Sequence, residues 1–377
     1  MDNVTQSTGL TKEDRGIIKM LEYIQLWNMG KDGRVHQPVF NDYQGQLGKM
    51  YLYLTFSCPN SCPFCYANAG KRTCVELSAD EFSKIISDGI EAGFESIVLL
   101  GGEPLVYSGF TSLLLKLKHM DHSQTRITLR SSLSLPMSDE LLSDICETFD
   151  SIVTSIDGDE ERHDSIRGEG RYARTIDNLR RGTAIGKASF GVNSVMSMED
   201  FSGPQGEHVK QICEELGISK LTIQSPVPLG RADNNGTERL YWKKTDDPLG
   251  LRGQTKFRSS CGLGHNLYIE PDGKTFPCYA WCLPEHQLGD LSRESLGELL
   301  DRKQLLEIMN HGVDTNRKCQ NCEVRYLCGG KCKIYVNDKH DIDSPDFDCS
   351  EKKAGILREL NWICDNFGNI IQSDENR

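Results

Sequence analysis

The sequence predicts an α/β protein whose first large domain is a partial (β/α)6 barrel. Between residues 50 and 225, short apolar runs typical of strands alternate with longer runs typical of amphipathic helices. This alternation predicts a parallel sheet with helices outside it. A complete eightfold barrel takes about 250 residues. The segment here is shorter and shows six strand-like runs, so we expect an incomplete barrel.

The six expected strands are short runs rich in β-branched and other apolar residues. They cover residues 50–56, 96–100, 126–131, 151–156, 190–196 and 220–224. A capping box, Ser78 to Glu81, predicts the start of the helix after the first strand. Farther on, residues 266–269 and 274–276 flank the turn Pro271 to Gly273 and predict a hairpin.

Four segments are expected along the chain. They are an N-terminal helical extension (1–49), the barrel domain (50–250), a cysteine-rich domain (251–350) and a C-terminal helix and tail (351–377). The extension carries a predicted helix from Thr11 to Asn28, with Thr11 as N-cap and Gly30 just past its end. The last segment carries a predicted helix from Lys352 to Phe367.

Composition restricts the partners. The 377 residues hold 43 Lys and Arg against 55 Asp and Glu, a net charge of −12, which disfavours binding to nucleic acid. No apolar run approaches the roughly 20 residues of a membrane span. Fifteen cysteines accompany a polar start, Met1 to Asp14, that does not resemble a signal peptide. A reducing cytoplasm is therefore expected, with the cysteines used for metal binding or catalysis.

Three cysteines follow directly on the first expected strand. Cys58, Cys62 and Cys65 have the spacing C-x3-C-x2-C. A 4Fe-4S cluster normally takes four cysteine ligands, so a cluster held by these three would leave one iron open for chemistry. The alternative is a zinc knuckle, which needs a fourth ligand nearby, and Cys74 is the candidate.

A second motif, Gly101-Gly102-Glu103-Pro104, follows the second expected strand. Two glycines let the backbone approach a ligand closely, and a carboxylate is the natural acceptor for a charged amine. Since ligands bind at the C-terminal ends of barrel strands, this motif and the three cysteines are expected to face one site. Alone, the motif would read equally well as an ordinary strand-to-helix turn.

Together the two motifs resemble those of the radical S-adenosylmethionine (SAM) enzymes, whose signature is C-x3-C-x-aromatic-C with Phe64 in the aromatic place. The resemblance implies that the open iron chelates the amino and carboxylate groups of SAM. An electron from the cluster then splits SAM into methionine and a 5′-deoxyadenosyl radical. It also implies that the segment from Gly101 to Pro104 receives the ammonium group of SAM.

Further positions match the family less closely. Ser131 and Ser132 stand where relatives often carry Asn and Gly, and the resemblance implies a ribose contact there. Ser155 and Arg167 match a Ser-Leu-Asp-Gly, His-Asp and Arg-Gly series, and by that similarity they hold the ribose and the methionine carboxylate of SAM. The alternative for Arg167 is a surface ion pair with Asp164 or Glu169.

The remaining motif cysteines resemble the SPASM domain, an extension that holds auxiliary 4Fe-4S clusters in radical SAM enzymes. Its seven-cysteine pattern is matched by Cys261, Cys278, Cys319, Cys322, Cys328, Cys332 and Cys349. The resemblance assigns one auxiliary cluster to Cys319, Cys322, Cys328 and Cys349. A second cluster is assigned to Cys261, Cys278 and Cys332, with either Cys282 or an open iron as the fourth position. A pair of zinc sites with four cysteines each is the alternative.

SPASM-containing relatives mostly modify peptides, so the resemblance implies a peptide maturase acting on a ribosomally made precursor. A low-potential flavodoxin or ferredoxin is the implied reductant, and a separate protein could bind the leader peptide. The alternatives are an anaerobic sulfatase-maturing enzyme, a small-molecule radical SAM dehydrogenase and a non-catalytic electron carrier. Glu270, Asp272 and Asp157 are candidate acids or bases, although turn and strand-end roles explain them as well.

Overall fold

The computed structural model describes residues 47–70, 73–234, 260–330, 332–333, 336, 338, 340–345 and 349–358. The helix predicted between Thr11 and Asn28 lies outside these residues. The described chain forms two compact units. We call 47–234 with 262–310 the barrel unit, and 260–261 with the residues from 311 onward the cysteine-rich unit. The domain boundaries predicted after residues 49, 250 and 350 stay predictions.

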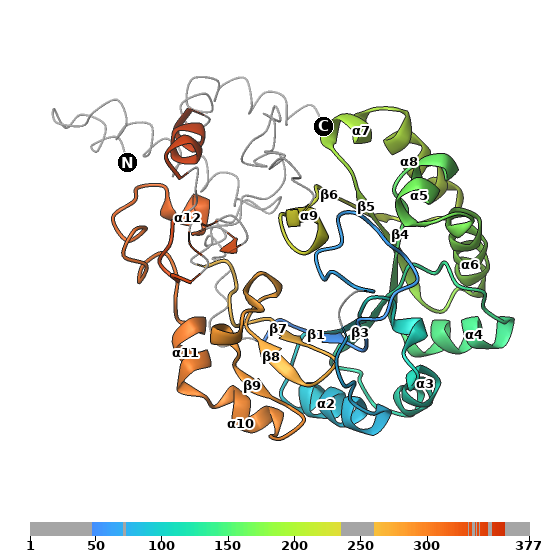
Figure 1. The fold of residues 1–377 in the computed structure, drawn as a ribbon, viewed down its shortest axis with the longest axis horizontal. Coiled ribbons are helices and arrows are strands. Elements are labelled where there is room, and N and C mark those ends of the chain that lie inside the picture. Colours follow the sequence, from blue (N-terminus) through green and yellow to red (C-terminus); the bar gives the residue numbers. More distant parts are fainter. Residues whose placement is uncertain are drawn as a thin grey trace, which may run out of the picture. The chain divides into compact units, whose positions relative to one another are not determined.

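The barrel unit is built on one open sheet of nine strands in the order β6-β5-β4-β3-β2-β1-β7-β8-β9. The six parallel strands are β1 (Lys49–Tyr53), β2 (Ser96–Leu100), β3 (Arg126–Arg130), β4 (Ser151–Ser155), β5 (Ser189–Val195) and β6 (Lys220–Gln224). The sheet curves without closing, with helices outside the curve (Figure 1). The predicted partial barrel is therefore confirmed.

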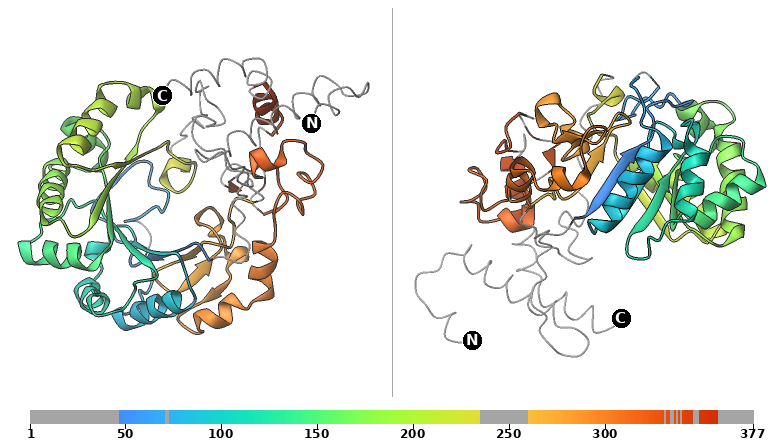
Figure 2. Two further views of the ribbon diagram at one scale, coloured as in Figure 1. Left: turned by 180° about the vertical axis from the view of Figure 1, so that it is seen from behind. Right: turned by 90° about the horizontal axis from the view of Figure 1, so that it is seen from below.

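Helices connect successive strands and cover the outer face of the sheet (Figures 1 and 2). They are α2 (Ala79–Glu91), α3 (Phe110–Lys118), α4 (Asp139–Thr148), α5 (Glu160–Arg167), α6 (Arg171–Ile185), α7 (Met198–Ser202) and α8 (Pro204–Glu215). The capping box predicted at the start of α2 is present, since Ser78 and Glu81 each accept from the backbone of the other. A short helix, α9 (Arg231–Asn234), follows β6.

The predicted hairpin is present and has a structural role in the barrel unit. β7 (Leu267–Ile269) pairs antiparallel with β8 (Lys274–Phe276), and β7 also pairs in parallel with β1. Gly273 closes the turn with φ of +91°, a conformation that favours glycine. β9 (Gly289–Asp290), α10 (Leu296–Leu300) and α11 (Lys303–Met309) complete the unit. The hairpin thus extends the barrel sheet beyond its first strand.

The two faces of the sheet carry different side chains because residues alternate along a strand. On the outer face Met50, Leu52 and their neighbours pack into the main apolar core. On the inner face Tyr53 packs with Tyr268 and Phe276 in a separate, smaller cluster. The inner face is therefore aromatic beside the hairpin.

The cysteine-rich unit has little regular structure among its described residues. It contains α12 (Arg325–Cys328) and a helix over 349–358. The second is the start of the predicted C-terminal helix, and the rest of that prediction lies outside the described residues. Among the described residues, no helix is long and apolar enough to cross a bilayer.

Candidate active site

The three cysteines of the first motif lie on the loop that follows β1, at the C-terminal end of the strand. The loop turns tightly, since the backbone N–H of Cys65 donates to the carbonyl of Cys62 at 3.2 Å. Burial raises the pKa of the Cys58 thiol to about 11, and Glu103, Cys62 and Cys65 add to the effect. The three thiols are thus close enough to act on one another, and a metal bound by their thiolates would displace protons.

The donor set fits an iron–sulfur cluster. All three thiols come from one loop, and thiolates are the soft donors that such clusters take. Among the described residues, no set of His, Cys, Asp and Glu side chains is arranged to hold a single metal ion. Cys74, the candidate fourth ligand of a zinc knuckle, packs beside the aromatic cluster of the inner face.

Gly101 and Gly102 let the end of β2 lie directly against the cysteine loop. A Cβ on Gly101 would come within 2.6 Å of the carbonyl oxygen of Thr55, and one on Gly102 within 2.3 Å of that of Ser57. Between these segments, the N–H of Gly102 donates to Thr55 at 2.8 Å and that of Glu103 to Ser57 at 2.9 Å. The close approach made by the two glycines is therefore to the chain itself. β1 itself ends at Tyr53, three residues earlier than predicted.

The Glu103 carboxylate is buried, with 1% of the residue exposed, and joins β2 to the segment after β3. One oxygen accepts from the Ser131 hydroxyl at 2.7 Å and from the Leu105 N–H at 3.3 Å. The other accepts from the N–H and hydroxyl of Ser132 at 2.8 and 2.5 Å. Since a carboxylate offers about four lone-pair sites, a ligand ammonium would share an oxygen with one of these donors or displace it.

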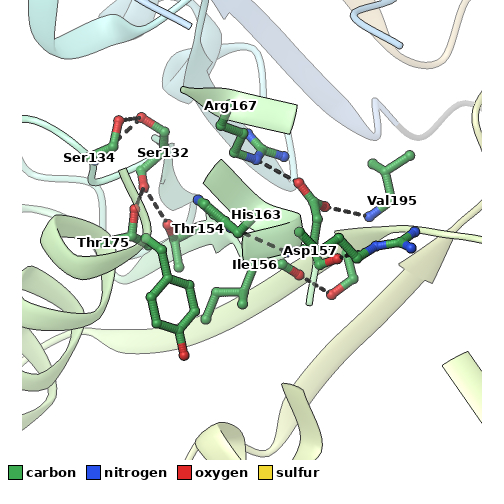
Figure 3. A network of polar contacts seen from close by, with 12 residues as sticks. Ser132, Ser134, Thr154, Ile156, Asp157, His163, Arg167, Thr175 and Val195 are labelled. Atoms are coloured by element: carbon green, nitrogen blue, oxygen red, sulfur yellow. Dashed lines mark hydrogen bonds and ion pairs between the residues drawn. The ribbon is translucent and has the colours of Figure 1, made fainter. Parts of the chain in front are cut away.

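Arg167 lies beside the cysteine loop in a buried ion pair. Its Nε donates to a carboxylate oxygen of Asp157 at 2.6 Å, and the other oxygen of Asp157 accepts from the N–H of Val195 at 2.8 Å (Figure 3). Burial disfavours the charged form of Arg167, but the charges of Asp157 and Cys62 outweigh it and raise the pKa. The guanidinium is therefore a fixed positive charge next to the cysteines.

The surface ion pair considered for Arg167 is wrong. The partner is the buried Asp157, whereas Asp164 accepts from the N–H groups of Gly170 and Tyr172 at 2.6 and 2.7 Å. Asp164 thereby anchors the turn between α5 and α6. The pattern of charges near Arg167 in sequence could not identify a partner ten positions earlier at the end of a strand.

Buried hydroxyls fix the segment that follows β3. The carbonyl of Ser132 accepts from Thr154 and Thr175, each at 3.0 Å (Figure 3). This segment includes Leu133 at a φ of +52°, which is unusual for a leucine. The backbone around Ser131 and Ser132 is thus held rigidly where it meets Glu103. Ser155, the last residue of β4, lies half-buried on the inner face of the sheet.

Gly230 and Arg231, which the sequence analysis did not single out, hold the cysteine loop from the other side. Arg231 Nε donates to the carbonyl of Cys62 at 2.8 Å and Nη1 to that of Ala69 at 2.5 Å. Its backbone N–H donates to Cys65 at 3.0 Å. Gly230 has φ of +59°, and a Cβ there would lie 2.4 Å from the carbonyl oxygen of Cys65. Arg231 therefore binds three backbone carbonyls of the cysteine loop.

Replacing Arg231 tests this role. Arg231→Gln is expected to remove the two guanidinium bonds and to loosen the loop, because hydrogen bonds from charged groups contribute about 1.5–3 kcal/mol each. Faster alkylation of the loop thiols in the metal-free protein and lower iron retention after reconstitution are the expected readouts. Arg293→Gln, an exposed arginine, is the matched control. Equal thiol reactivity in the Arg231 variant and the wild type would contradict the role.

His163 is fully buried near the ion pair of Arg167 and Asp157. Its burial predicts that the stability of the fold depends on pH. Burial, together with the charge of Arg167, lowers its pKa from 6.5 to about 4. Between these values the unfolded chain binds more protons than the folded one, so stability falls as the pH drops from 6.5 toward 4. The loss between pH 7 and 5 is expected to be about 2 kcal/mol.

His163→Asn checks this effect, because an asparagine keeps an acceptor for the N–H of Asp157, which His163 Nδ1 accepts at 3.4 Å. Denaturant titration at pH 7 and pH 5 should show a smaller loss of unfolding free energy in the variant than in the wild type. An identical loss in both proteins would mean that His163 does not control it.

Four of the SPASM-type cysteines come together in the cysteine-rich unit. Burial raises the pKa of the Cys319 thiol to about 11, and Cys328, Cys349 and Cys322 add to the rise in that order. The N–H of Cys322 donates to the carbonyl of Cys319 at 2.8 Å. This is the set that the resemblance assigned to one auxiliary cluster. Lys333, buried in the same unit, bears a charge that opposes the rise at Cys319.

The other assigned cysteines are divided between the units. Cys261 and Cys332 belong to the cysteine-rich unit. Cys278 and Cys282 lie in the barrel unit, where the Cys282 thiol is 3.5 Å from the carbonyl of Cys278. Cys282 packs beside the aromatic cluster of the inner face. Both cysteines therefore lie shortly after β8, the second strand of the hairpin.

Comparison with known proteins agrees with this geometry. Residues 52–198 match the radical SAM superfamily, and residues 261–323 match an iron–sulfur cluster-binding domain, SPASM. The chain is therefore a radical SAM protein with a SPASM domain. A radical SAM domain binds a 4Fe-4S cluster and SAM. The SPASM domain binds further iron–sulfur clusters.

The chain is also similar in sequence to two proteins with maturation functions. The chain is 26% identical over 312 residues to the sporulation killing factor maturation protein SkfB of Bacillus subtilis, covering 76% of this chain and 70% of SkfB. It is 33% identical over 78 residues to a serine-type anaerobic sulfatase-maturating enzyme of Klebsiella aerogenes, which is 21% of this chain and 19% of that one.

A solved structure shares the fold. Streptococcus suis SuiB bound to precursor peptide SuiA aligns with a TM-score of 0.62 at 16% identity, over 81% of this chain and 76% of SuiB. SuiB bound to S-adenosylmethionine aligns with a TM-score of 0.63 at 15% identity, over 93% and 85% of the two chains.

Proposed function

We propose that this chain is a radical SAM peptide maturase acting on a ribosomally made precursor peptide. The observation that carries the proposal is the cysteine loop with the charges of Glu103 and Arg167 acting on it, on a barrel of the radical SAM superfamily. The similarity to SkfB, which extends over 76% of the chain, supports a peptide as the substrate.

Cys58, Cys62 and Cys65 would hold the 4Fe-4S cluster. When bound, this cluster supplies an open iron for SAM and the electron that splits it into methionine and a 5′-deoxyadenosyl radical. The chain's own residues bind and orient SAM. The segment from Gly101 to Pro104 would meet the ammonium group, and Arg167 the carboxylate, because a guanidinium can offer two bonds to it.

Positioning residues keep that arrangement rigid. Asp157 holds the Arg167 guanidinium through Nε, which leaves the Nη edge to face a ligand. Ser131 and Ser132 hold Glu103, and this contact gives a structural reason for serines at positions where relatives often carry Asn and Gly. Ser155, on the inner face at the end of β4, is the proposed ribose contact.

The SPASM-type cysteines would hold two auxiliary 4Fe-4S clusters. The effect of Cys328, Cys349 and Cys322 on the Cys319 thiol supports these four cysteines as one ligand set. The second set would be Cys261, Cys278 and Cys332, completed by Cys282 or by an open iron. Auxiliary clusters can accept the second electron of an oxidation, so they favour a net oxidation or a crosslink in the peptide.

The test is mass spectrometry of the short peptide encoded beside this gene, coexpressed anaerobically with the protein. A mass change that requires Cys58 is the expected result, with loss of two hydrogens indicating a crosslink or an oxidation. Cys58→Ala is the control for the radical chemistry. An unchanged peptide, after a check for mass-silent epimerisation, would contradict the proposal.

Sulfatase maturation is the second candidate, favoured by the 78-residue similarity to the Klebsiella aerogenes enzyme. It predicts a cysteine or serine of a sulfatase-derived peptide converted to formylglycine, which the same mass measurement would detect. For either substrate we propose a low-potential flavodoxin or ferredoxin as the reductant. A separate protein could bind the leader peptide, and the density of cysteines supports a reducing, cytoplasmic setting.

A further inference from the structure

The inner face of the barrel sheet carries a cluster of basic side chains. We call it the basic inner-face cluster, and it consists of Lys49, Arg126, Arg130 and Lys220. Strand register brings these residues into two rows. Lys49 and Arg126 are both opposite Ser96 of β2. Arg130 and Lys220 are joined through Val153 of β4 and Gly191 of β5.

Alternation along the strands puts the four residues on the same face. Ile127 and Leu129 pack into the outer core, so Arg126 and Arg130 point the other way. Lys49 shares its face with Tyr53 of the inner aromatic cluster. Lys220 lies against Gly191, with Cδ 3.5 Å from where a Cβ would be, an ordinary van der Waals distance.

Few acidic side chains of the described chain lie near these four positive charges. Among the described residues, none of the four forms an ion pair with an Asp or Glu, although the chain as a whole is acidic. The groups that act on Lys49 are the other three bases and one acid, Glu95. Burial, and then Arg130 and Lys220, lower the pKa of Lys49, while Glu95 opposes the change. The positive charges of the cluster therefore act on Lys49, one of its own members.

Arg130 is the most enclosed member of the cluster. Its Nε is buried and has no hydrogen-bond partner among the described residues. Its guanidinium lies 5.7 Å from the centre of the Tyr51 ring, which is within the range of a cation–π contact. Tyr51 in turn stacks on Tyr268 with ring centres 4.5 Å apart. A buried donor without a partner is costly, so an anion that meets this guanidinium gains more than it would at an exposed one.

The position of Arg130 links it to the radical-generating site. It ends β3 and directly precedes Ser131, which binds Glu103. Its charge also acts on Tyr66, the residue after Cys65. The other three members begin β1, β3 and β6, at the edge of the sheet away from the cysteine loop, and they are exposed.

We propose that the basic inner-face cluster binds a carboxylate of the peptide substrate, with Arg130 as its main contact. The inference rests on the proposed function, since it assigns a substrate preference to the same site. Arg130 suits a carboxylate because its planar fork donates two parallel bonds. The preferred peptide therefore has an acidic side chain, or its own C-terminal carboxylate, near the carbon that is modified.

Binding of synthetic probes to the reconstituted protein tests the inference without turnover. The first probe is an acetylated and amidated hexapeptide of alternating Gly and Glu, and the second has Gln in place of Glu. A third, the Gln peptide with a free C-terminus, separates a C-terminal carboxylate from an acidic side chain. The Glu probe, the free-acid probe or both should bind at least about tenfold tighter than the neutral one, as expected for 1.4 kcal/mol.

Variants assign the preference to Arg130. Arg130→Gln should abolish it, and Arg130→Lys should retain part of it, because the charge stays while the fork is lost. Arg293→Gln, an exposed arginine, should leave it unchanged. Circular dichroism checks that the Arg130 variants fold.

Two results would overturn the inference. One is equal binding of the three probes by the wild type, and the other is competition by SAM, which would assign Arg130 to the carboxylate of SAM. Because this experiment measures binding and not turnover, equal binding of the probes would not contradict the proposal of peptide maturation. A failed maturation test likewise leaves the carboxylate preference standing.

Discussion

Cys62→Ala is expected to abolish cluster assembly at the barrel site and to reduce SAM cleavage to background. Two thiolates cannot replace three as ligands of a 4Fe-4S cluster, and Cys62 acts on Arg167 more strongly than Cys58 does. Iron content of the reconstituted variant should fall by about one cluster. The electron paramagnetic resonance signal that responds to SAM should disappear.

Cys146→Ala is the matched control, because this thiol is also buried but lies in α4 against the carbonyl of Gly182. We expect a stability loss on the order of 1 kcal/mol for this small core truncation, with the cluster and the signal intact. If Cys62→Ala kept a SAM-responsive cluster, the assignment of the three cysteines would be wrong.

Asp157→Asn is expected to destabilise the folded protein by about 3–5 kcal/mol, because it leaves the buried Arg167 guanidinium without its counter-charge. Asp157 is fully buried and the Arg167 side chain is only 9% exposed, so solvent screens the pair weakly. An asparagine can still accept from Val195, so the loss reports on the charge. Denaturant unfolding measures it, and SAM affinity should fall with it.

Asp88→Asn provides the comparison, since Asp88 pairs with the exposed Lys84 on α2. Exposed pairs of this kind contribute about 0.3–0.5 kcal/mol. A loss of similar size in the two variants would show that the Asp157 pair is not a buried determinant of stability.

Local sequence predicted the elements of the barrel unit well. The alternating runs gave all six parallel strands, and Ser78 with Glu81 gave the start of α2, because strand periodicity and capping depend on neighbouring residues. The turn Pro271 to Gly273 identified the hairpin for the same reason. Its parallel pairing with β1 was not predicted, since the two strands are separated by more than 200 residues.

The contacts that build the site were less accessible to sequence reasoning. Cys58, Cys62, Cys65 and the glycines were recognised by their spacing, but the close packing of Gly102 on Ser57 depends on two strands lying side by side. Arg231 acts on carbonyls more than 160 positions earlier. Gly230, which lies between β6 and α9, is the one local sign in the sequence of a close approach there.

Reductive cleavage of SAM tests the central claim most directly. The reconstituted wild-type protein, given SAM and dithionite without oxygen, should form 5′-deoxyadenosine and methionine in equal amounts, and Cys58→Ala should form neither. A fully assembled cluster that produced no 5′-deoxyadenosine under these conditions would contradict the account and would favour an electron carrier.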